Sequence, residues 1–326
     1  MSTTQGPFPP LEPEERETTG PDTEPISSAL EPAMDSPPPL ESSPFLSRYY
    51  ELPEVHAEPR IPNMGHVAIL ALIALCGLFG ASLAARAALE MHLFGVTTLA
   101  QATNDIHYTL GTEAILYLLT FAGSLVIFPL LWRKGFLAGL QWRGRTALAL
   151  RGRLVSSAVI CFMLALVNGI LIPGPENAPI DRLFRTPGAA WLLFAFGVTA
   201  APFFEELAFR GFLLPAFCTA FDWMGEQWKG LAPQPLDKNG HPNWSRQAMG
   251  AASVVTSILF ALLHGDQTGY SLGPFLLLVC VSLVLSWARL GTRSLAASVV
   301  VHACYNFILF SFMFLGTSGF RHLDKM

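Results

Sequence analysis

The chain has 326 residues, of which 52% are hydrophobic and 13% are charged, and its mean hydropathy is +0.43. A soluble domain of this length carries roughly twice that charged fraction, so the composition excludes an ordinary soluble protein and indicates one that crosses a membrane repeatedly. The formal net charge of −4 hides a split, because residues 1–63 hold twelve acidic and three basic residues. The remaining basic residues lie at the ends of apolar segments rather than on a patch with interleaved aromatics, which argues against a nucleic-acid partner.

Residues 1–62 are rich in Pro, Glu, Ser and Thr. Few of them could bury apolar area, so this segment is predicted to be a disordered tail, and its proline runs are interpreted as solvated spacers. We divide the rest of the chain into N-terminal transmembrane helices at 63–188, a helical core at 189–316 and a short polar tail at 317–326.

Seven apolar segments follow the tail, and a helix needs ~20 residues to cross the hydrocarbon core of a bilayer. They are residues 67–89, 112–132, 154–172, 189 to about 221, 249–263, 272–288 and 295–315. The fourth is too long for one straight span and is expected to be tilted, broken near Pro202, or split into two short helices. The fifth is short, which leaves an eighth crossing or a re-entrant segment open. The predicted fold is therefore an all-α bundle of about seven to eight transmembrane helices.

Two features of these segments predict how they meet their surroundings. Small side chains line one face of the first segment and favour close helix packing; they are Gly77, Gly80, Ala81, Ala84 and Ala85. Three tryptophans at segment ends are expected in the aromatic belt at the membrane surface; they are Trp132, Trp191 and Trp287.

The loop between the second and third segments predicts the orientation. It holds six basic residues and no acidic one, namely Arg133, Lys134, Arg143, Arg145, Arg151 and Arg153. Cytoplasmic loops carry such an excess, so this loop and the N-terminal tail are predicted to be cytoplasmic, and residues 89–111 to lie outside. The short loops favour a multi-pass protein of the bacterial cytoplasmic (inner) membrane.

Polar residues interrupt the last four apolar segments, and ionisable groups inside a membrane usually mark function. The first set is Glu205, Glu206 and Arg210. Glu206 and Arg210 are four residues apart, so they share a helix face and can neutralise each other. Neighbouring residues diverge by roughly 100° around a helix, which leaves Glu205 free to face other groups. For Glu206 and Arg210 a structural ion pair is the favoured interpretation.

The other polar residues are His264, His302 and Asn306, of which the last two also share a helix face. A carboxylate, two imidazoles and a carboxamide in a low-dielectric pocket suit hydrolysis, with the glutamate as general base and N–H groups stabilising an oxyanion. The same Glu and two His could instead bind zinc. The residues alone leave both chemistries open, as well as capping by His264 and interhelical hydrogen bonding by His302 and Asn306.

Three short patterns stand in one order, each in an apolar segment: Glu-Glu-x-x-x-Arg at 205–210, Phe-x-x-x-His at 260–264 and His-x-x-x-Asn at 302–306. Together they resemble the motifs of the CAAX prenyl protease and bacteriocin-processing family, the type II CAAX endopeptidases. The resemblance covers roughly residues 189–316. Residues 222–247 depart from it, since this polar segment is long for the link between the first two patterns.

The resemblance implies an intramembrane glutamic endopeptidase without a metal cofactor, acting on a membrane-anchored or lipid-modified protein or peptide. Glu205 would activate water, His264 would position it, and His302 with Asn306 would form the oxyanion site. The alternatives are a non-catalytic immunity or scaffold protein of the same fold and a zinc-dependent peptidase, with a transporter as a third. One conflict stands, because straight helices would place Glu205 and His264 at different depths unless the fourth segment bends or the fifth begins at the interface.

Overall fold

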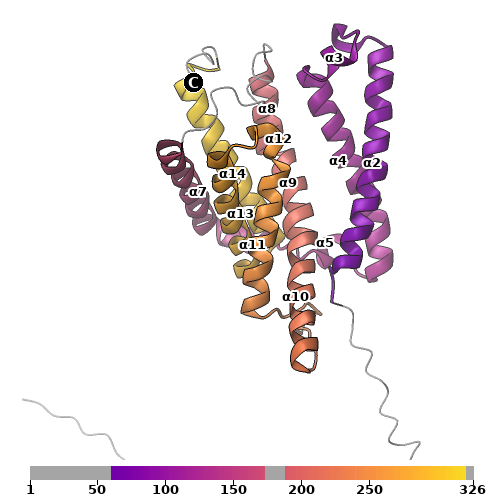
Figure 1. The fold of residues 1–326 in the computed structure, drawn as a ribbon, viewed down its shortest axis with the longest axis vertical. Helices are drawn as coiled ribbons and strands as arrows, with labels where there is room; N and C mark the ends of the chain where they lie inside the picture. Colours follow the sequence, from indigo (N-terminus) through magenta and orange to yellow (C-terminus); the bar gives the residue numbers. More distant parts are fainter. Residues whose placement is uncertain (1–59, 173–187, 239, 321–326) are drawn as a thin grey trace, which may run out of the picture. The chain divides into compact units, whose positions relative to one another are not determined.

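The computed structural model describes residues 60–172, 188–238 and 240–320. Within these ranges every regular element is a helix, and seven helical stretches are long and apolar enough to cross a membrane (Figure 1). The predicted all-α membrane protein is thereby confirmed, with seven candidate spans and no eighth among the described residues. The tail predicted for residues 1–62 lies outside the described residues except for its last three.

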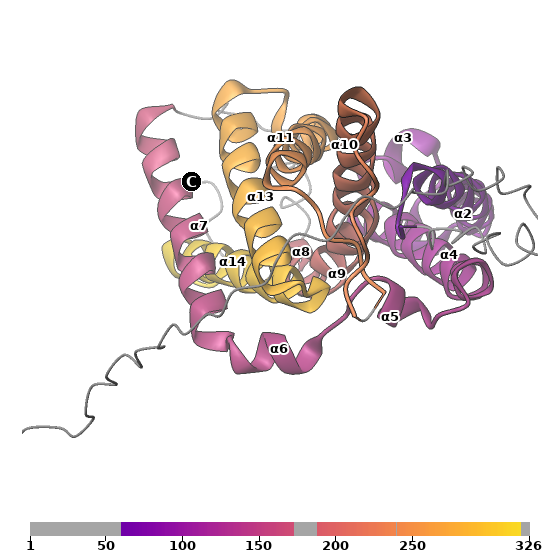
Figure 2. The same ribbon diagram turned by 90° about the horizontal axis from the view of Figure 1, so that it is seen from below.

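The N-terminal half of the described chain contains three of the spans and four short helices. The spans are α2 (Met64–Glu90), α4 (Ile106–Trp132) and α7 (Arg151–Leu171). The short helices are η1 (Leu93–Gly95), α3 (Leu99–Ala102), α5 (Phe136–Gly139) and α6 (Gly144–Ala149). Figure 2 shows α5 and α6 linking α4 to α7, so the basic segment predicted as a loop is partly helical.

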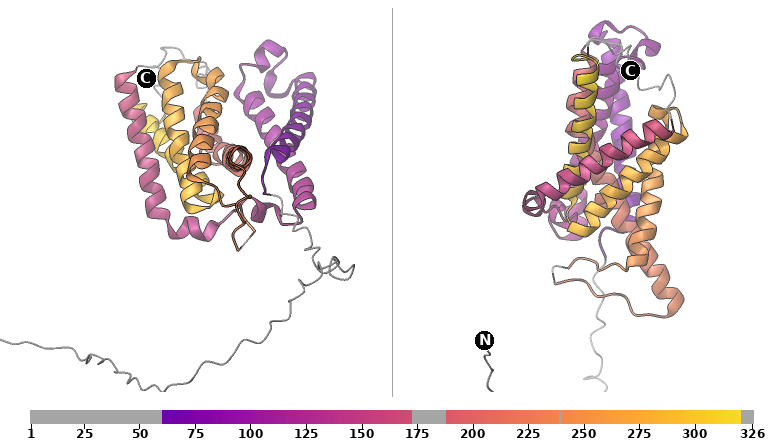
Figure 3. Two further views of the ribbon diagram at one scale, coloured as in Figure 1. Left: turned by 60° about the horizontal axis from the view of Figure 1, so that its bottom comes forward. Right: turned by 90° about the vertical axis from the view of Figure 1, so that its left-hand side faces the viewer.

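The C-terminal half contains the remaining four spans. One continuous stretch combines α8 (Ala189–Val198), α9 (Ala200–Glu206), the π-helix η3 (Leu207–Leu213) and α10 (Leu214–Lys229). It is followed by α11 (Arg246–Leu263), the one-turn helix α12 (Gly265–Thr268), α13 (Leu272–Thr292) and α14 (Leu295–Gly316). Residues 222–229, expected in a polar loop, continue α10, which extends past the end of α11 (Figures 1 and 3).

The small residues of α2 pack against α4, as the sequence predicted. Gly77 and Ala81 are buried, and a Cβ atom at Gly77 would lie 2.9 Å from the Thr120 hydroxyl of α4. Across the seam, a Cβ at Gly123 would meet the Ile73 side chain at 2.7 Å. Glycine therefore sets how closely these two helices approach.

The long fourth span is interrupted at Thr199, three residues before the proline where a break was expected. Thr199 has φ −114° and ψ −73° and separates α8 from α9. Pro202 lacks an N–H, and its ring crowds the carbonyl of Val198 four residues earlier. The proline thus interrupts the helix about one turn before its own position, between α8 and α9.

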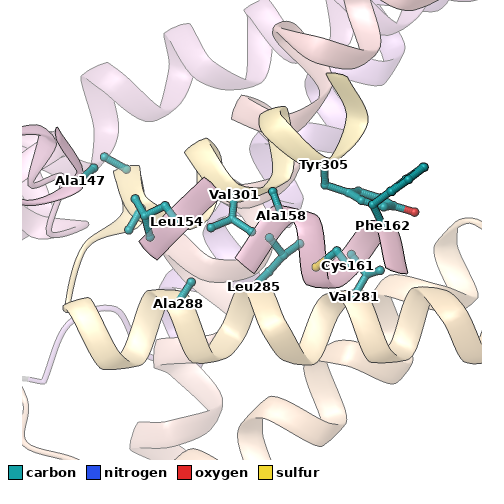
Figure 4. Packing of buried hydrophobic residues seen from close by; sticks show 12 residues of the cluster. Ala147, Leu154, Ala158, Cys161, Phe162, Val281, Leu285, Ala288, Val301 and Tyr305 are labelled. Atoms are coloured by element: carbon teal, nitrogen blue, oxygen red, sulfur yellow. The ribbon is translucent and has the colours of Figure 1, made fainter. Parts of the chain in front are cut away.

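A hydrophobic core forms where α7, α13 and α14 meet (Figure 4). Its buried members include Leu154, Ala158, Cys161, Leu285 and Val301. These side chains come from one stripe of each helix, which is how helices bury apolar area against one another. The core fixes α14, and with it the third sequence motif, against the rest of the bundle.

Trp132 does not stand in an aromatic belt, which corrects the prediction; its side chain is buried at 6% exposure. Arg133 adopts the left-handed conformation with φ 51°, so the chain turns back and α5 covers Trp132. The ring stacks on Phe128 and Phe136. Trp191 and Trp287 are exposed, as an interfacial position requires.

Candidate active site

The two glutamates of the first motif are the last residues of α9 and lead directly into the π-helix η3. The Glu206 side chain is fully buried, and its Oε1 accepts a hydrogen bond from Arg210 Nη1 at 2.8 Å. The expected pair is therefore present. Glu206 and Arg210 neutralise each other inside the bundle, where an isolated charge would be costly.

Arg210 also ties this segment to α13. Its Nη2 donates to the backbone oxygen and the hydroxyl of Ser282, at 3.0 and 2.7 Å. Its guanidinium lies over the Phe260 ring of α11 at 4.8 Å. One buried arginine thus positions the first motif against two other helices.

His302 on α14 contacts both glutamates, which the sequence did not predict for Glu206. Its Nδ1 lies 2.9 Å from Glu206 Oε1. A carboxylate already engaged by an arginine can only accept, so Nδ1 carries the proton of this contact. The Nε2 atom then faces Glu205 Oε2 at 3.9 Å.

His264 caps the C-terminal end of α11 and, like His302, directs its Nε2 atom toward Glu205. Its Nδ1 lies 2.8 Å from the carbonyl oxygen of Phe260, which also can only accept. Its Nε2 lies 3.7 Å from Glu205 Oε2. The two imidazoles therefore direct Nε2 toward one carboxylate oxygen.

Glu205 Oε2 is buried and makes no hydrogen bond within the described part of the chain. Both separations to the imidazoles exceed a direct hydrogen bond, and polar groups at such distances are commonly bridged by water. When the imidazoles are neutral, Oε2 and both Nε2 atoms are acceptors. A water molecule, with two protons to donate, suits this arrangement.

The conflict in depth between Glu205 and His264 is resolved by where α11 begins. Ser245, which caps α11, donates its backbone N–H to Asp222 of α10 at 3.0 Å. From that junction the chain runs ~25 Å back to Glu205 and ~28 Å along α11 to His264, at 1.5 Å per residue. The two residues therefore reach the same level.

Asn306 lies one turn beyond His302 on α14, but its side chain turns to another helix. Its Nδ2 donates to the carbonyl oxygen of Gly197 at 2.7 Å, next to the break at Thr199. The structure therefore brings Glu205, Glu206, Arg210, His264 and His302 together and places one Asn306 amide hydrogen on the backbone of α8.

Glu113 of α4 was not singled out in the sequence, where it stands second in the segment expected at 112–132. The helix begins six residues earlier, at Ile106, so Glu113 lies well inside it. Its carboxylate accepts a 2.6 Å hydrogen bond from Tyr117 and interacts electrostatically with Glu205 and His264. The Tyr117 ring contacts Phe204, with centroids 4.8 Å apart. An acidic residue inside a complete helix was the available signal.

No group of three or more His, Cys, Asp or Glu within residues 60–172, 188–238 and 240–320 is arranged to hold a metal ion. Two of the candidate zinc ligands already direct their Nδ1 atoms to Phe260 and Glu206. Only the two Nε2 atoms and the Glu205 oxygen would remain to bind zinc.

In a comparison with known proteins, the region that contains all three motifs matches one family model. Residues 187–308 match the family model for type II CAAX prenyl endopeptidase Rce1-like proteins. No curated protein and no solved structure matches the chain. The matched range includes every site residue named from the sequence, and it confirms the family resemblance.

Proposed function

We propose that the chain, whose residues 187–308 match the family model for type II CAAX prenyl endopeptidase Rce1-like proteins, is an intramembrane peptidase in which Glu205 activates the water that hydrolyses the substrate. The substrate class is a membrane-associated or lipid-modified protein or peptide. The observation that carries this proposal is the buried Glu205 Oε2 with two imidazole Nε2 atoms at 3.7 and 3.9 Å. Water held among these acceptors is polarised for attack on a peptide carbonyl.

In the first step, Glu205 takes a proton from water as the oxygen attacks the carbonyl carbon, which gives a tetrahedral oxyanion. Glu205 then returns the proton to the leaving amine as the C–N bond breaks. The role of His302 depends on Glu206, because Nδ1 donates to that carboxylate. His302 can donate from Nε2 to the oxyanion only when both of its ring nitrogens carry a proton.

His264 and Asn306 complete the proposal. His264, fixed by the Phe260 carbonyl, orients the water on Glu205. Asn306 has a second amide hydrogen besides the one given to Gly197, and this hydrogen is available for the oxyanion.

A non-catalytic immunity or scaffold protein of the same fold is the second candidate. A scaffold needs the Glu206–Arg210–Ser282 contacts, which join helices. It has no use for a carboxylate oxygen that faces two imidazole Nε2 atoms at distances a water molecule can bridge. Glu205 therefore favours the enzyme.

The test uses the purified full chain in lipid nanodiscs, with fluorogenic peptides that do or do not carry a prenylated cysteine. Hydrolysis of the membrane-anchored peptide is expected, and activity should survive exhaustive chelation with no stoichiometric zinc. A folded protein inactive on anchored and soluble peptides alike would support the scaffold. Activity lost on chelation and restored by zinc would make Glu205, His264 and His302 metal ligands.

We propose further that the N-terminal tail is cytoplasmic in a bacterial inner membrane, because the basic residues between α4 and α7 follow the positive-inside rule. A reporter fused after Arg145 should then report the cytoplasm, and one fused at Pro175 should report the outside. The opposite pair of signals would reverse the orientation.

A further inference from the structure

The π-helix that follows Glu205 and Glu206 leaves one backbone carbonyl without a donor from its own helix. The N–H of Leu214 bonds to the carbonyl of Phe209, five residues earlier. It is therefore diverted from Arg210, whose carbonyl it would meet in an α-helix. The next donor along the chain would come from residue 215, which is proline and has no N–H.

Arg289 of α13 supplies the missing hydrogen bond. Its Nε donates to the Arg210 carbonyl at 3.2 Å, and its side chain is buried at 1% exposure. Its two other nitrogens donate to Gln141 Oε1 at 3.0 Å and to the Leu140 carbonyl at 3.4 Å. No carboxylate in the described ranges forms an ion pair with Arg289, and these three hydrogen bonds all go to neutral oxygens.

A fully buried arginine without an acidic partner is expensive to keep, because its charge is desolvated and only neutral acceptors compensate it. Arg289 lies outside the three sequence motifs. Its rigid, forked guanidinium can reach both the Arg210 carbonyl and the Leu140–Gln141 turn, a geometry that a lysine ammonium does not reproduce.

We propose that Arg289 is a positioning residue that holds the π-helix open, opposite Pro215, and thereby fixes the register of Glu205 and Glu206 toward the two histidines. Pro215 removes the N–H that would continue the π-helical pattern to the Arg210 carbonyl, and Arg289 supplies that hydrogen bond instead. An α-helical segment would rotate Arg210 relative to the glutamates by part of a turn. The ion pair with Glu206 and the bonds to Ser282 would no longer form together.

This proposal rests on the proposed peptidase function for its effect on turnover, while its effect on the fold is independent of catalysis. Five variants separate the two. They are Arg289→Met, Pro215→Ala, the double variant of these, Gln141→Ala as the matched control, and Gln141→Ala combined with Pro215→Ala. Pro215→Ala restores an N–H that can bond to the Arg210 carbonyl. Gln141→Ala removes another partner of Arg289 but leaves the Arg210 carbonyl bonded.

Melting temperature in nanodiscs and amide hydrogen exchange of residues 207–214 are measured on all variants, together with kcat and KM per folded protein. Arg289→Met should melt lower, exchange faster in this segment, and lose about 10- to 100-fold in kcat with KM little changed, because sub-ångström misplacement of catalytic groups acts on the chemical step. Pro215→Ala alone should resemble the wild type. The double variant should recover most of the loss in both readouts.

Gln141→Ala should lower the melting temperature without rescue by Pro215→Ala. A double variant as impaired as Arg289→Met would overturn the proposal, as would an Arg289→Met protein with wild-type exchange and kcat. If the wild type shows no peptidase activity, the proposed function fails, and the exchange and melting cycle still decides whether Arg289 and Pro215 act on the same carbonyl.

Discussion

The α2–α4 pair and the motif-bearing helices are held together by different means in the same membrane. Between α2 and α4 the contact is made by glycine and small apolar side chains, with Gly77 against Thr120 and Gly123 against Ile73. Around the motifs, buried charges and hydroxyls join α9, α13 and α14, with Arg210 at the centre.

The difference shows what a buried polar network costs and what it provides. Close packing stabilises the α2–α4 pair, although the hydroxyls of Thr120 and Ser124 on α4 are buried without a hydrogen-bond partner within the described residues. Around the motifs, Glu205 Oε2, Glu206 Oε2 and Arg210 Nε likewise have no hydrogen-bond partner within the described residues. The unsatisfied atoms of α4 are neutral, whereas those around the motifs belong to charged groups, whose burial costs more stability.

Among the variants that test this difference between the two regions, Glu206→Gln should have the largest effect. The change removes the charge that Arg210 and His302 both contact, and breaking a buried pair costs about 3–5 kcal/mol. We expect a large fall in yield and melting temperature, with weak activity in any folded fraction because His302 loses its orienting carboxylate. A stable but inactive Glu206→Gln protein would instead give Glu206 the catalytic role assigned here to Glu205.

The α2–α4 seam provides the second test, because it is held by packing. Gly77→Ala would place its Cβ 2.9 Å from the Thr120 hydroxyl and 3.3 Å from the Leu116 carbonyl. Overpacking of this kind costs about 1–3 kcal/mol, so the melting temperature should fall while kcat per folded protein is retained. Gly111→Ala in α4, where a Cβ meets nothing within 4 Å, is the control and should be neutral or stabilising. A loss of kcat in Gly77→Ala would show that the seam also shapes the site.

Glu113 and Tyr117 stand where α4 faces the motif-bearing helices, and they should give the smallest effect. Glu113→Gln removes a charge that interacts electrostatically with Glu205 and His264 but makes no hydrogen bond to either, so kcat should change by less than about tenfold. Tyr117→Phe, which keeps the ring on Phe204, should change it less. A loss as large as that of a catalytic residue in Glu113→Gln would place Glu113 in the chemistry itself.

The sequence predicts what depends on one helix at a time. Apolar length located all seven spans, and helical spacing separated Glu205 from the Glu206–Arg210 pair. Contacts between helices were not accessible in this way. The second partner of Glu206, the turn of Asn306 to Gly197 and the burial of Trp132 all depend on how neighbouring helices meet.

The π-helix illustrates the same limit. Pro215 is visible in the sequence, but its effect depends on a donor from α13, 74 positions further along the chain. Arg289 lies in the last turn of an apolar helix, where basic residues are common, and its sequence neighbours give no sign of the carbonyl that it bonds. Glu113 was overlooked for a simpler reason, since the start of its helix was placed six residues too late and the glutamate stood at the expected end of the span.

The most direct test of the account is the turnover of Glu205→Gln measured per folded protein, beside the wild type, on the same anchored peptide. Glutamine keeps the size of the side chain and adds no charge to the membrane, so melting temperature should be little changed. Loss of the general base should lower kcat by about 10²–10⁴-fold. Cleavage by Glu205→Gln at the wild-type rate would contradict the assignment of Glu205 as the residue that activates water.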